Sequence, residues 1–242
     1  MIVFSLLVGL ASASPAESLQ EANSQYSSGH YSEAAEQYAA LADAGHKSGD
    51  VFYNLGNALY RDGRIGHAVL AWETALSLNP RNGDAAANIG IALRAAGGTG
   101  ESGFSRSGPL FLNQTLSHRE QSVLAALFFF ALGLLALVAQ RRDLAWGIPS
   151  VMLGLPGSYL LVSIAWSQAQ SDLGVVLEPD TAMRSALGVD RGVELQKLHW
   201  GSTVRILEET EEHLLIELSE GESGWVGIRQ VAPIDAAGEF PL

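Results

Sequence analysis

The stretch "NLGNALYRDGRIGHAVLAWETALSLNP", from Asn54 to Pro80, decides the fold of the N-terminal part of the chain. Apolar residues recur at helical spacing on both sides of Gly63, which predicts two amphipathic helices joined by a tight turn. Gly56 and Ala68 are small enough to let the two helices approach closely. Pro80 cannot continue a helical hydrogen-bond ladder, so the second helix is expected to end before it.

The same pattern returns along residues 22–95 with a period of 34 residues. A period of this length, with small residues at fixed places, is typical of helix–turn–helix repeats. The chain is therefore expected to form two repeats followed by one further helix, from about Asp84 to Ala95. An ordinary helical hairpin bundle with accidental spacing is the alternative. The matched positions include Asn23 with Asn57, Gly29 with Gly63, Ala34 with Ala68, and Tyr38 with Trp72.

This segment, residues 14–96, closely resembles the tetratricopeptide repeat family. The resemblance implies a receptor for a protein or peptide partner, because the first helices of such repeats line a concave face. Asparagine can pair with an extended peptide backbone, and tyrosine offers apolar contact at a low cost in conformational entropy. Tyr31 and Tyr38 are expected to pack between helices instead. The groove residues that the resemblance implies are Asn23, Tyr26, Tyr53, Asn57, Tyr60, Arg61 and Asn88.

The first thirteen residues, "MIVFSLLVGLASA", have the pattern of a secretory signal. An apolar core from Ile2 to Leu10 is followed by small residues suited to cleavage, although no lysine or arginine precedes it. A short N-terminal anchor or a buried helix is the alternative for residues 1–13. After the repeats, residues 97–118 begin with the Gly/Ser-rich run "GGTGESGFSRSG", which predicts a flexible linker.

Residues 119–167 contain two long uncharged apolar runs, Ser122 to Ala139 and Leu144 to Trp166. The first run has 18 residues, which as a helix reach about 27 Å, enough for the core of a bilayer. Trp146 and Trp166 lie at the two ends of the second run, where amphipathic rings favour the membrane interface. These runs predict a two-helix transmembrane hairpin, with a buried hairpin of a soluble domain as the alternative.

The loop between the two runs, "QRRD", contains Arg141 and Arg142. Basic residues favour the cytoplasmic side of a membrane, so this loop is expected inside the cell. The signal pattern of residues 1–13 independently directs the repeats outward. Both observations predict a two-span protein of a bacterial inner (cytoplasmic) membrane, with both soluble domains facing the periplasm.

Residues 168–235 predict a small all-β domain, followed by a tail at 236–242. The short segments "GVVL", "TVRIL", "HLLIEL" and "GWVGI" alternate with Gly-, Glu- and Asp-bearing turns. The segments "LHWGSTVRILEE" and "GESGWVGIRQVAPI" resemble the bacterial SH3-like family, which implies a small barrel. Trp225 is interpreted as a core residue of that barrel. The predicted fold class is therefore multidomain: all-α tetratricopeptide repeats, a two-helix transmembrane hairpin and a small all-β SH3-like barrel.

Composition argues against several classes of function. The formal net charge is −12, and residues 168–242 alone carry 14 acidic and 5 basic side chains, which would repel nucleic acid. Cysteine is absent, so no thiol nucleophile or cysteine-ligated metal is available. The six histidines show no spacing typical of a metal site or a catalytic pair. We therefore expect no enzyme activity, no metal and no cofactor.

The order of signal, repeats, hairpin and SH3-like domain resembles the tetratricopeptide proteins of the Bacteroides-aerotolerance (Bat) operons. The resemblance implies a non-enzymatic scaffold in a membrane complex linked to aerotolerance or envelope stress. It also implies partners: membrane proteins with von Willebrand factor A domains and, indirectly, a MoxR-type ATPase. The alternative is an envelope-anchoring protein whose SH3-like domain contacts peptidoglycan while the repeats support it.

Overall fold

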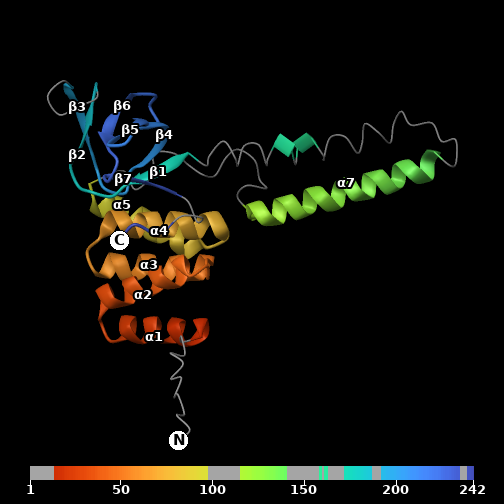
Figure 1. Ribbon diagram of the computed structural model, residues 1–242, viewed down its shortest axis with the longest axis horizontal. Coiled ribbons are helices and arrows are strands. Elements are labelled where there is room, and N and C mark those ends of the chain that lie inside the picture. The colour runs from red at the N-terminus through yellow and green to blue at the C-terminus, as the bar shows by residue number, and fades with distance from the viewer. Residues whose placement is uncertain are drawn as a thin grey trace, which may run out of the picture.

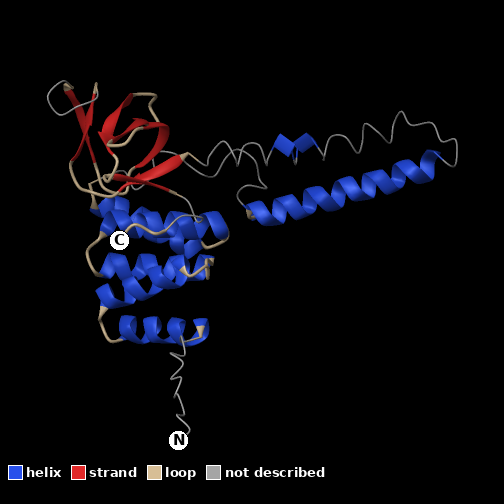
Figure 2. Ribbon diagram, viewed as in Figure 1, coloured by secondary structure: helices blue, strands red, loops and turns tan. Residues whose placement is uncertain are grey.

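A computed structural model gives the architecture as a stack of helices, a sheet domain beside the end of that stack, and one long helix that projects away from both (Figures 1 and 2). The structure describes residues 14–97, 115–140, 158–159, 161–162, 172–186, 192–234 and 239–242.

Five helices form the stack, and their bounds repeat as the sequence predicts. The first helices of successive units begin at Pro15, Gly49 and Gly83, which are spaced 34 residues apart. Side-chain oxygens of Ser14, Ser48 and Asn82 accept hydrogen bonds from backbone N–H groups in the following turns, and these bonds fix the three starts. The helices are α1 (Pro15–Ser27), α2 (Tyr31–Asp43), α3 (Gly49–Arg61), α4 (Ile65–Leu78) and α5 (Gly83–Ala95).

Glycine makes the turn inside each repeat. Gly29 follows α1 with φ of 85°, and Gly63 follows α3 with φ of 87°. These left-handed values cost a residue with a Cβ atom, so glycine is favoured at both places. The second helix of each repeat, α2 or α4, then folds back on the first.

The helical core is built around the second repeat. Trp72 of α4 is 2% exposed and lies directly against Gly56 of α3, where an added Cβ would clash with the indole ring. Phe52, Leu55 and Leu59 of α3 complete this layer and are almost fully buried. The close approach of Trp72 to Gly56 explains why a small residue is needed at position 56.

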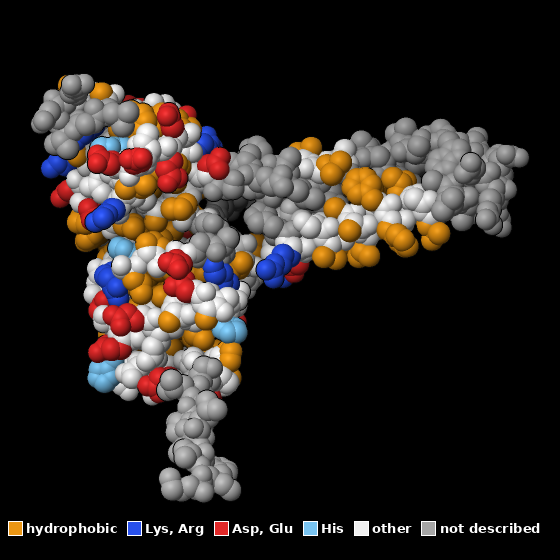
Figure 3. Space-filling model, in the orientation of Figure 1, with side chains coloured by type: hydrophobic (Ala, Val, Ile, Leu, Met, Phe, Trp, Pro, Cys, Tyr) orange, Lys and Arg blue, Asp and Glu red, His pale blue; other side chains and the backbone are white. Residues whose placement is uncertain are grey.

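Helix α7 (His118–Gln140) begins at a capping box formed by Ser117 and Glu120. Arg81, just after α4, holds this start in place. Its guanidinium donates to a carboxylate oxygen of Glu120 at 2.7 Å and to the carbonyl of Thr115 at 3.1 Å. Beyond its first turn the helix exposes apolar side chains, seen as orange spheres along it in Figure 3. These exposed side chains are Val123, Leu124, Leu127, Phe129, Phe130 and Leu134.

Among the described residues, no helix combines the length and the apolar content that a membrane span requires. The second predicted span, Leu144 to Trp166, lies outside the described residues except at positions 158–159 and 161–162. Arg141, Arg142 and the predicted signal at residues 1–13 also lie outside them.

The C-terminal domain is an antiparallel sheet of seven strands in the order β3-β2-β6-β5-β4-β1-β7. Four strands coincide with the segments predicted from the sequence, and β2, β3 and β7 are additional. In the described residues β3 and β7 form the two edges, so the sheet does not close into a barrel. The strands are β1 (Leu173–Val176), β2 (Thr181–Arg184), β3 (Glu194–Leu198), β4 (Thr203–Glu209), β5 (His213–Glu217), β6 (Ser223–Gly227) and β7 (Val231–Pro233).

Every strand contributes a side chain to one core, which includes Val176, Met183, Ile216 and Val226. The prediction that Trp225 belongs to this core is wrong. Successive side chains of a strand point to opposite faces, and on β6 it is Val226 that enters the core while Trp225 stays half-buried.

Strand β1 joins the sheet domain to the helical repeats. All four of its residues are buried, which is unusual for a short strand in an antiparallel sheet. Val176 packs into the sheet's own core, whereas Leu173 and Val175 join the core of the helices, together with Leu177 just after the strand. The two domains therefore share one apolar interface, which Figure 1 shows as β1 and β7 beside α4.

Two glycines allow the close approach at this interface. A Cβ on Gly66 of α4 would collide with the backbone of Leu177. Across the same interface, Gly201 follows β3 with φ of 75°, and an added Cβ there would lie 3.0 Å from side-chain atoms of Val69 of α4 and Leu93 of α5. At these two glycines the backbone of one domain thus lies close to atoms of the other, with no room for a side chain between them.

Candidate peptide-binding face of the repeats

The residues predicted to line a groove all lie on α1, α3 and α5, the first helices of the successive repeat units. Asn23 and Arg61 are exposed, and the remaining five are half-buried. Helix α1 carries Asn23 and Tyr26, α3 carries Tyr53, Asn57, Tyr60 and Arg61, and α5 carries Asn88.

Asn23 and Asn57, the groove asparagines of the two repeats, each accept a hydrogen bond from an aromatic side chain within the same repeat, which the sequence analysis missed. In the first repeat, the hydroxyl of Tyr38 donates to Oδ1 of Asn23 at 2.6 Å. In the second repeat, Nε1 of Trp72 donates to Oδ1 of Asn57 at 3.2 Å. Both pairs span 15 residues, so the same bond ties the two helices of each repeat together. The common spacing, repeated at the period of 34, is the signal that could have revealed it.

Asn57 also connects the second repeat to the helix that follows. Its Oδ1 accepts a second hydrogen bond, from Nδ2 of Asn88 at 3.1 Å. An amide oxygen has two lone pairs, so the acceptor capacity of this atom is filled by Trp72 and Asn88. These bonds use only the oxygen of Asn57, so a bound peptide would meet that side chain as a donor through Nδ2.

Aromatic rings and one guanidinium group form a connected surface between the repeats. The rings of Tyr26 and Tyr31 meet edge to face with centroids 5.4 Å apart. Arg61 places its guanidinium carbon 4.5 Å from the centroid of Tyr31, within the range of a cation–π contact. Tyr31 was predicted to pack between helices, and it does so while also contacting Arg61 of the next repeat.

The second repeat has its own aromatic contact. Tyr60 lies against Trp72, with ring centroids 5.6 Å apart. Tyr38 is 1% exposed, and its burial, together with the nearby Tyr26, raises the pKa of its hydroxyl to about 12. Tyr38 therefore stays protonated at neutral pH and acts as the donor to Asn23.

These side chains equip the face for recognition. It offers aromatic surface, amide donors and one fixed positive charge from Arg61, which together suit an extended peptide. In the described part of the chain, no group of three or more His, Asp or Glu side chains is arranged to hold a metal ion. The face therefore has the means to bind a polar backbone and apolar side chains.

Comparison with known families agrees with this geometry for one repeat. Residues 49–82, which span α3, α4 and the following turn, match the family model of the tetratricopeptide repeat. No curated protein and no solved structure matches the chain. The helical part thus has tetratricopeptide character, and such repeats are typically interaction modules.

Proposed function

We propose that the protein is a non-enzymatic, membrane-anchored scaffold whose repeats hold a protein or peptide partner outside the cytoplasm. The tetratricopeptide match at residues 49–82 supports the interaction role. The aromatic and amide face on α1, α3 and α5 supplies the means of recognition. The seven groove residues named above are the proposed contacts, with Tyr38 and Trp72 holding two of them in position.

The shared core of the two domains supports the proposed topology. Helix α5 ends at Ala95 and β1 begins at Leu173, and both predicted apolar spans lie between them. Because β1 packs into the core of the helices, both domains must lie on the same side of any membrane. The connecting chain must then cross an even number of times, and two apolar runs fit a single hairpin.

Further features support anchoring by that hairpin. Helix α7 exposes Phe130 at 74% and Leu127 at 59%, more than a helix in water normally leaves uncovered along one stretch. Arg141 and Arg142 favour a cytoplasmic turn. The proposed location is therefore the inner membrane of a bacterium, with both domains in the periplasm and residues 1–13 serving as an export signal.

Within this topology the proposed complex is of the Bat type, with a von Willebrand factor A-domain membrane protein as the direct partner. In this topology the turn "QRRD" would offer only four residues to the cytoplasm, too few for an ATPase to hold. Any coupling to a MoxR-type ATPase is then indirect, through another membrane subunit. Peptidoglycan binding by the sheet domain has less support, because the end of β4 and the turn before β5 expose four acidic side chains, Glu208, Glu209, Glu211 and Glu212.

Fusion of an export-dependent phosphatase after Gly100 and, separately, after Leu242 tests the topology. Activity at both points is expected. Activity at one point only would contradict the hairpin, and activity at neither, with an active cytosolic reporter at both, would place both domains in the cytoplasm.

Recovery of the partner tests the groove. Tyr53→Ala is expected to reduce co-purification of the von Willebrand factor A-domain protein. Glu36→Ala, at an exposed position on α2, is the matched control and should leave recovery unchanged. Asn57→Ala is a poor probe for this purpose, because it also removes the acceptor of Trp72.

A further inference from the structure

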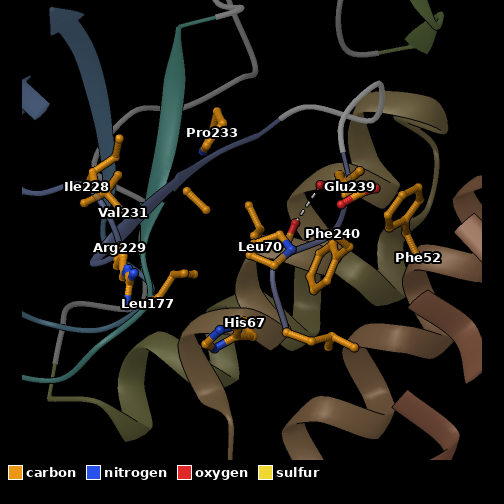
Figure 4. Close-up of a pocket in the computed structure, with 14 residues that line it drawn as sticks. Phe52, His67, Leu70, Leu177, Ile228, Arg229, Val231, Pro233, Glu239 and Phe240 are labelled. Carbon is orange, nitrogen blue, oxygen red and sulfur yellow. Dashed lines mark hydrogen bonds between the residues drawn. The ribbon is translucent and has the colours of Figure 1, made fainter. Parts of the chain in front are cut away.

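A cavity of about 470 Å³ lies between the second repeat and the sheet domain. Phe52 and Leu70 form its wall on the helices, and Leu177 and Val231 form its wall on the sheet domain (Figure 4). None of the seven predicted groove residues lines this cavity. It is therefore a separate site, created only when the two domains pack together.

The end of the chain already occupies one side of this cavity. Glu239 to Leu242, the segment "EFPL", runs along the helices, and Phe240 is half-buried among them. Figure 4 shows the ring of Phe240 between Leu70 and Phe52. Its centroid lies 6.1 Å from that of Phe52, a tilted aromatic contact.

A backbone hydrogen bond fixes the same residue. The N–H of Phe240 donates to Oδ1 of Asp43, the last residue of α2, at 3.1 Å. The contact joins positions 197 residues apart, so chain connectivity alone does not impose it. Asp43 is exposed on the helix and supplies a charged acceptor to the backbone of the tail.

Together these contacts define what the site accepts. Phe52 and Leu70 contact an aromatic side chain, and Asp43 accepts from the backbone N–H of the same residue. The next residue is proline, which has no N–H group to satisfy and favours an extended backbone. Such features match a segment of the form Phe-Pro-aliphatic.

We propose that the helix surface beside this cavity, formed by Asp43, Phe52 and Leu70, is a second peptide-binding site, specific for a Phe-Pro segment, which the chain's own Glu239–Leu242 occupies. A partner protein with a similar segment binds here by displacing the tail. The proposal goes beyond the scaffold role assigned to the repeats, and it holds whether or not the protein is anchored in a membrane.

Occupation by the chain's own tail has a measurable consequence. A tethered segment acts at an effective concentration in the millimolar range, so even weak contacts keep it bound. An external peptide must compete with it. Phe240→Ala removes the aromatic group of the tail and leaves the walls intact, so the site becomes available.

Fluorescence anisotropy with a labelled peptide of the sequence AAGEFPL, which is that of residues 236–242, tests the proposal on the full chain. The Phe240→Ala chain is expected to bind this peptide about ten-fold more tightly than the unchanged chain does. The peptide AAGEAPL is expected to bind neither. Equal affinity of both chains for AAGEFPL, or equal binding of the two peptides, would overturn the proposal.

A second pair of variants locates the site on the helices. In the Phe240→Ala chain, adding Asp43→Ala is expected to weaken binding of AAGEFPL by about three- to ten-fold, the effect of one hydrogen bond. Adding Glu36→Ala removes the same charge from an exposed position of the same helix and should leave binding unchanged. If both additions weaken binding equally, the peptide is held by general charge, and the assigned site is wrong.

Discussion

The first and second repeats are built on one plan, yet they are buried to very different extents. Helices α1 and α2 have one and six buried residues, whereas the equivalent helices α3 and α4 have six and nine. Helix α4 packs against α3 on one side and against β1 of the sheet domain on another. The second repeat is therefore the structural centre of the molecule, and the first repeat is an extension of it.

The family match falls on the more deeply buried repeat, at residues 49–82. Both repeats have small residues at the equivalent positions, Ala22 and Ala34 in the first and Gly56 and Ala68 in the second, where Trp72 packs closely. The first repeat has a tyrosine, Tyr38, in place of that tryptophan. The residues of α1 face solvent on most sides and are less constrained.

The largest expected effect comes from removing the central ring of the second repeat. Trp72→Ala should lower the free energy of unfolding by about 3–5 kcal/mol, because it leaves a cavity next to Gly56. Tyr38→Ala is the matched change in the first repeat and should cost less. Chemical denaturation of the full chain, followed by circular dichroism, measures both. A larger loss for Tyr38→Ala would contradict the central place of the second repeat.

The next effect tests the contact between the domains. Gly66→Ala forces a methyl group against the backbone of Leu177 and should destabilise the chain by about 1–3 kcal/mol. Gly83→Ala is the control, since a Cβ on Gly83 meets no atom within 4 Å. That change should be neutral or stabilise by up to about 1 kcal/mol. Gly66→Ala should therefore lower the melting temperature of the chain, whereas Gly83→Ala should leave it unchanged or raise it.

A smaller difference is expected between the two asparagines. Asn57→Ala leaves both Trp72 Nε1 and Asn88 Nδ2 without their acceptor and should cost about 1–3 kcal/mol. Asn23→Ala removes a single bond, from Tyr38, and should cost about 1 kcal/mol. Equal losses in denaturant titrations would show that the bond between Asn57 and Asn88 adds nothing.

The smallest effect concerns pH. Burial and the nearby Arg64 lower the pKa of His67 below its ordinary value of 6.5, although Glu178 opposes the change. The unfolded chain then binds a proton more readily than the folded chain, so stability is full above pH 6.5 and falls as the pH decreases toward the folded pKa. His67→Gln should flatten this decline in melting temperatures measured from pH 7 to pH 5. An unchanged slope would mean that another group causes it.

The helices could be predicted from the sequence because their information is local. Glycine at 29 and 63, together with the period of 34, fixed the turns and the bounds of each repeat. Alternating apolar residues likewise located four strands of the sheet. The bond between Asn57 and Trp72 is also implicit in the sequence, but it can be interpreted only once two helices are known to face each other.

The interface between the domains could not be predicted in the same way. Leu173 and Val175 meet helices that lie about a hundred residues earlier in the chain. The apolar run "LGVVL" is typical of a strand buried on both faces, but a pattern of this kind does not name the surface that covers it. The contact between Asp43 and Phe240 joins residues 197 positions apart, so no local pattern predicts it either.

Disulfide trapping tests the central claim, that the sheet domain and the second repeat form one body. The chain has no cysteine, so Val69→Cys with Gly201→Cys introduces a single pair. A Cβ built on Gly201 lies 3.5 Å from Cβ of Val69, within the range of a disulfide. Because Gly201 has φ of 75° and its Cβ would also lie 3.0 Å from Leu93, the reduced double variant must first be shown by circular dichroism to unfold cooperatively, as the unchanged chain does. Arg205→Cys with Glu217→Cys, directly opposite each other on β4 and β5, is the positive control.

The account predicts that mild oxidation of the full chain in intact membranes joins residues 69 and 201 within one molecule. To detect the link, the chain is cut by a protease between the two cysteines and run on a gel without reductant. If the disulfide has formed, the two fragments stay joined and migrate at the size of the uncut chain. If the control pair forms its disulfide while the 69–201 pair forms none, or links only separate molecules, then the two domains are not packed as described, and the argument that places both on one side of the membrane fails with it.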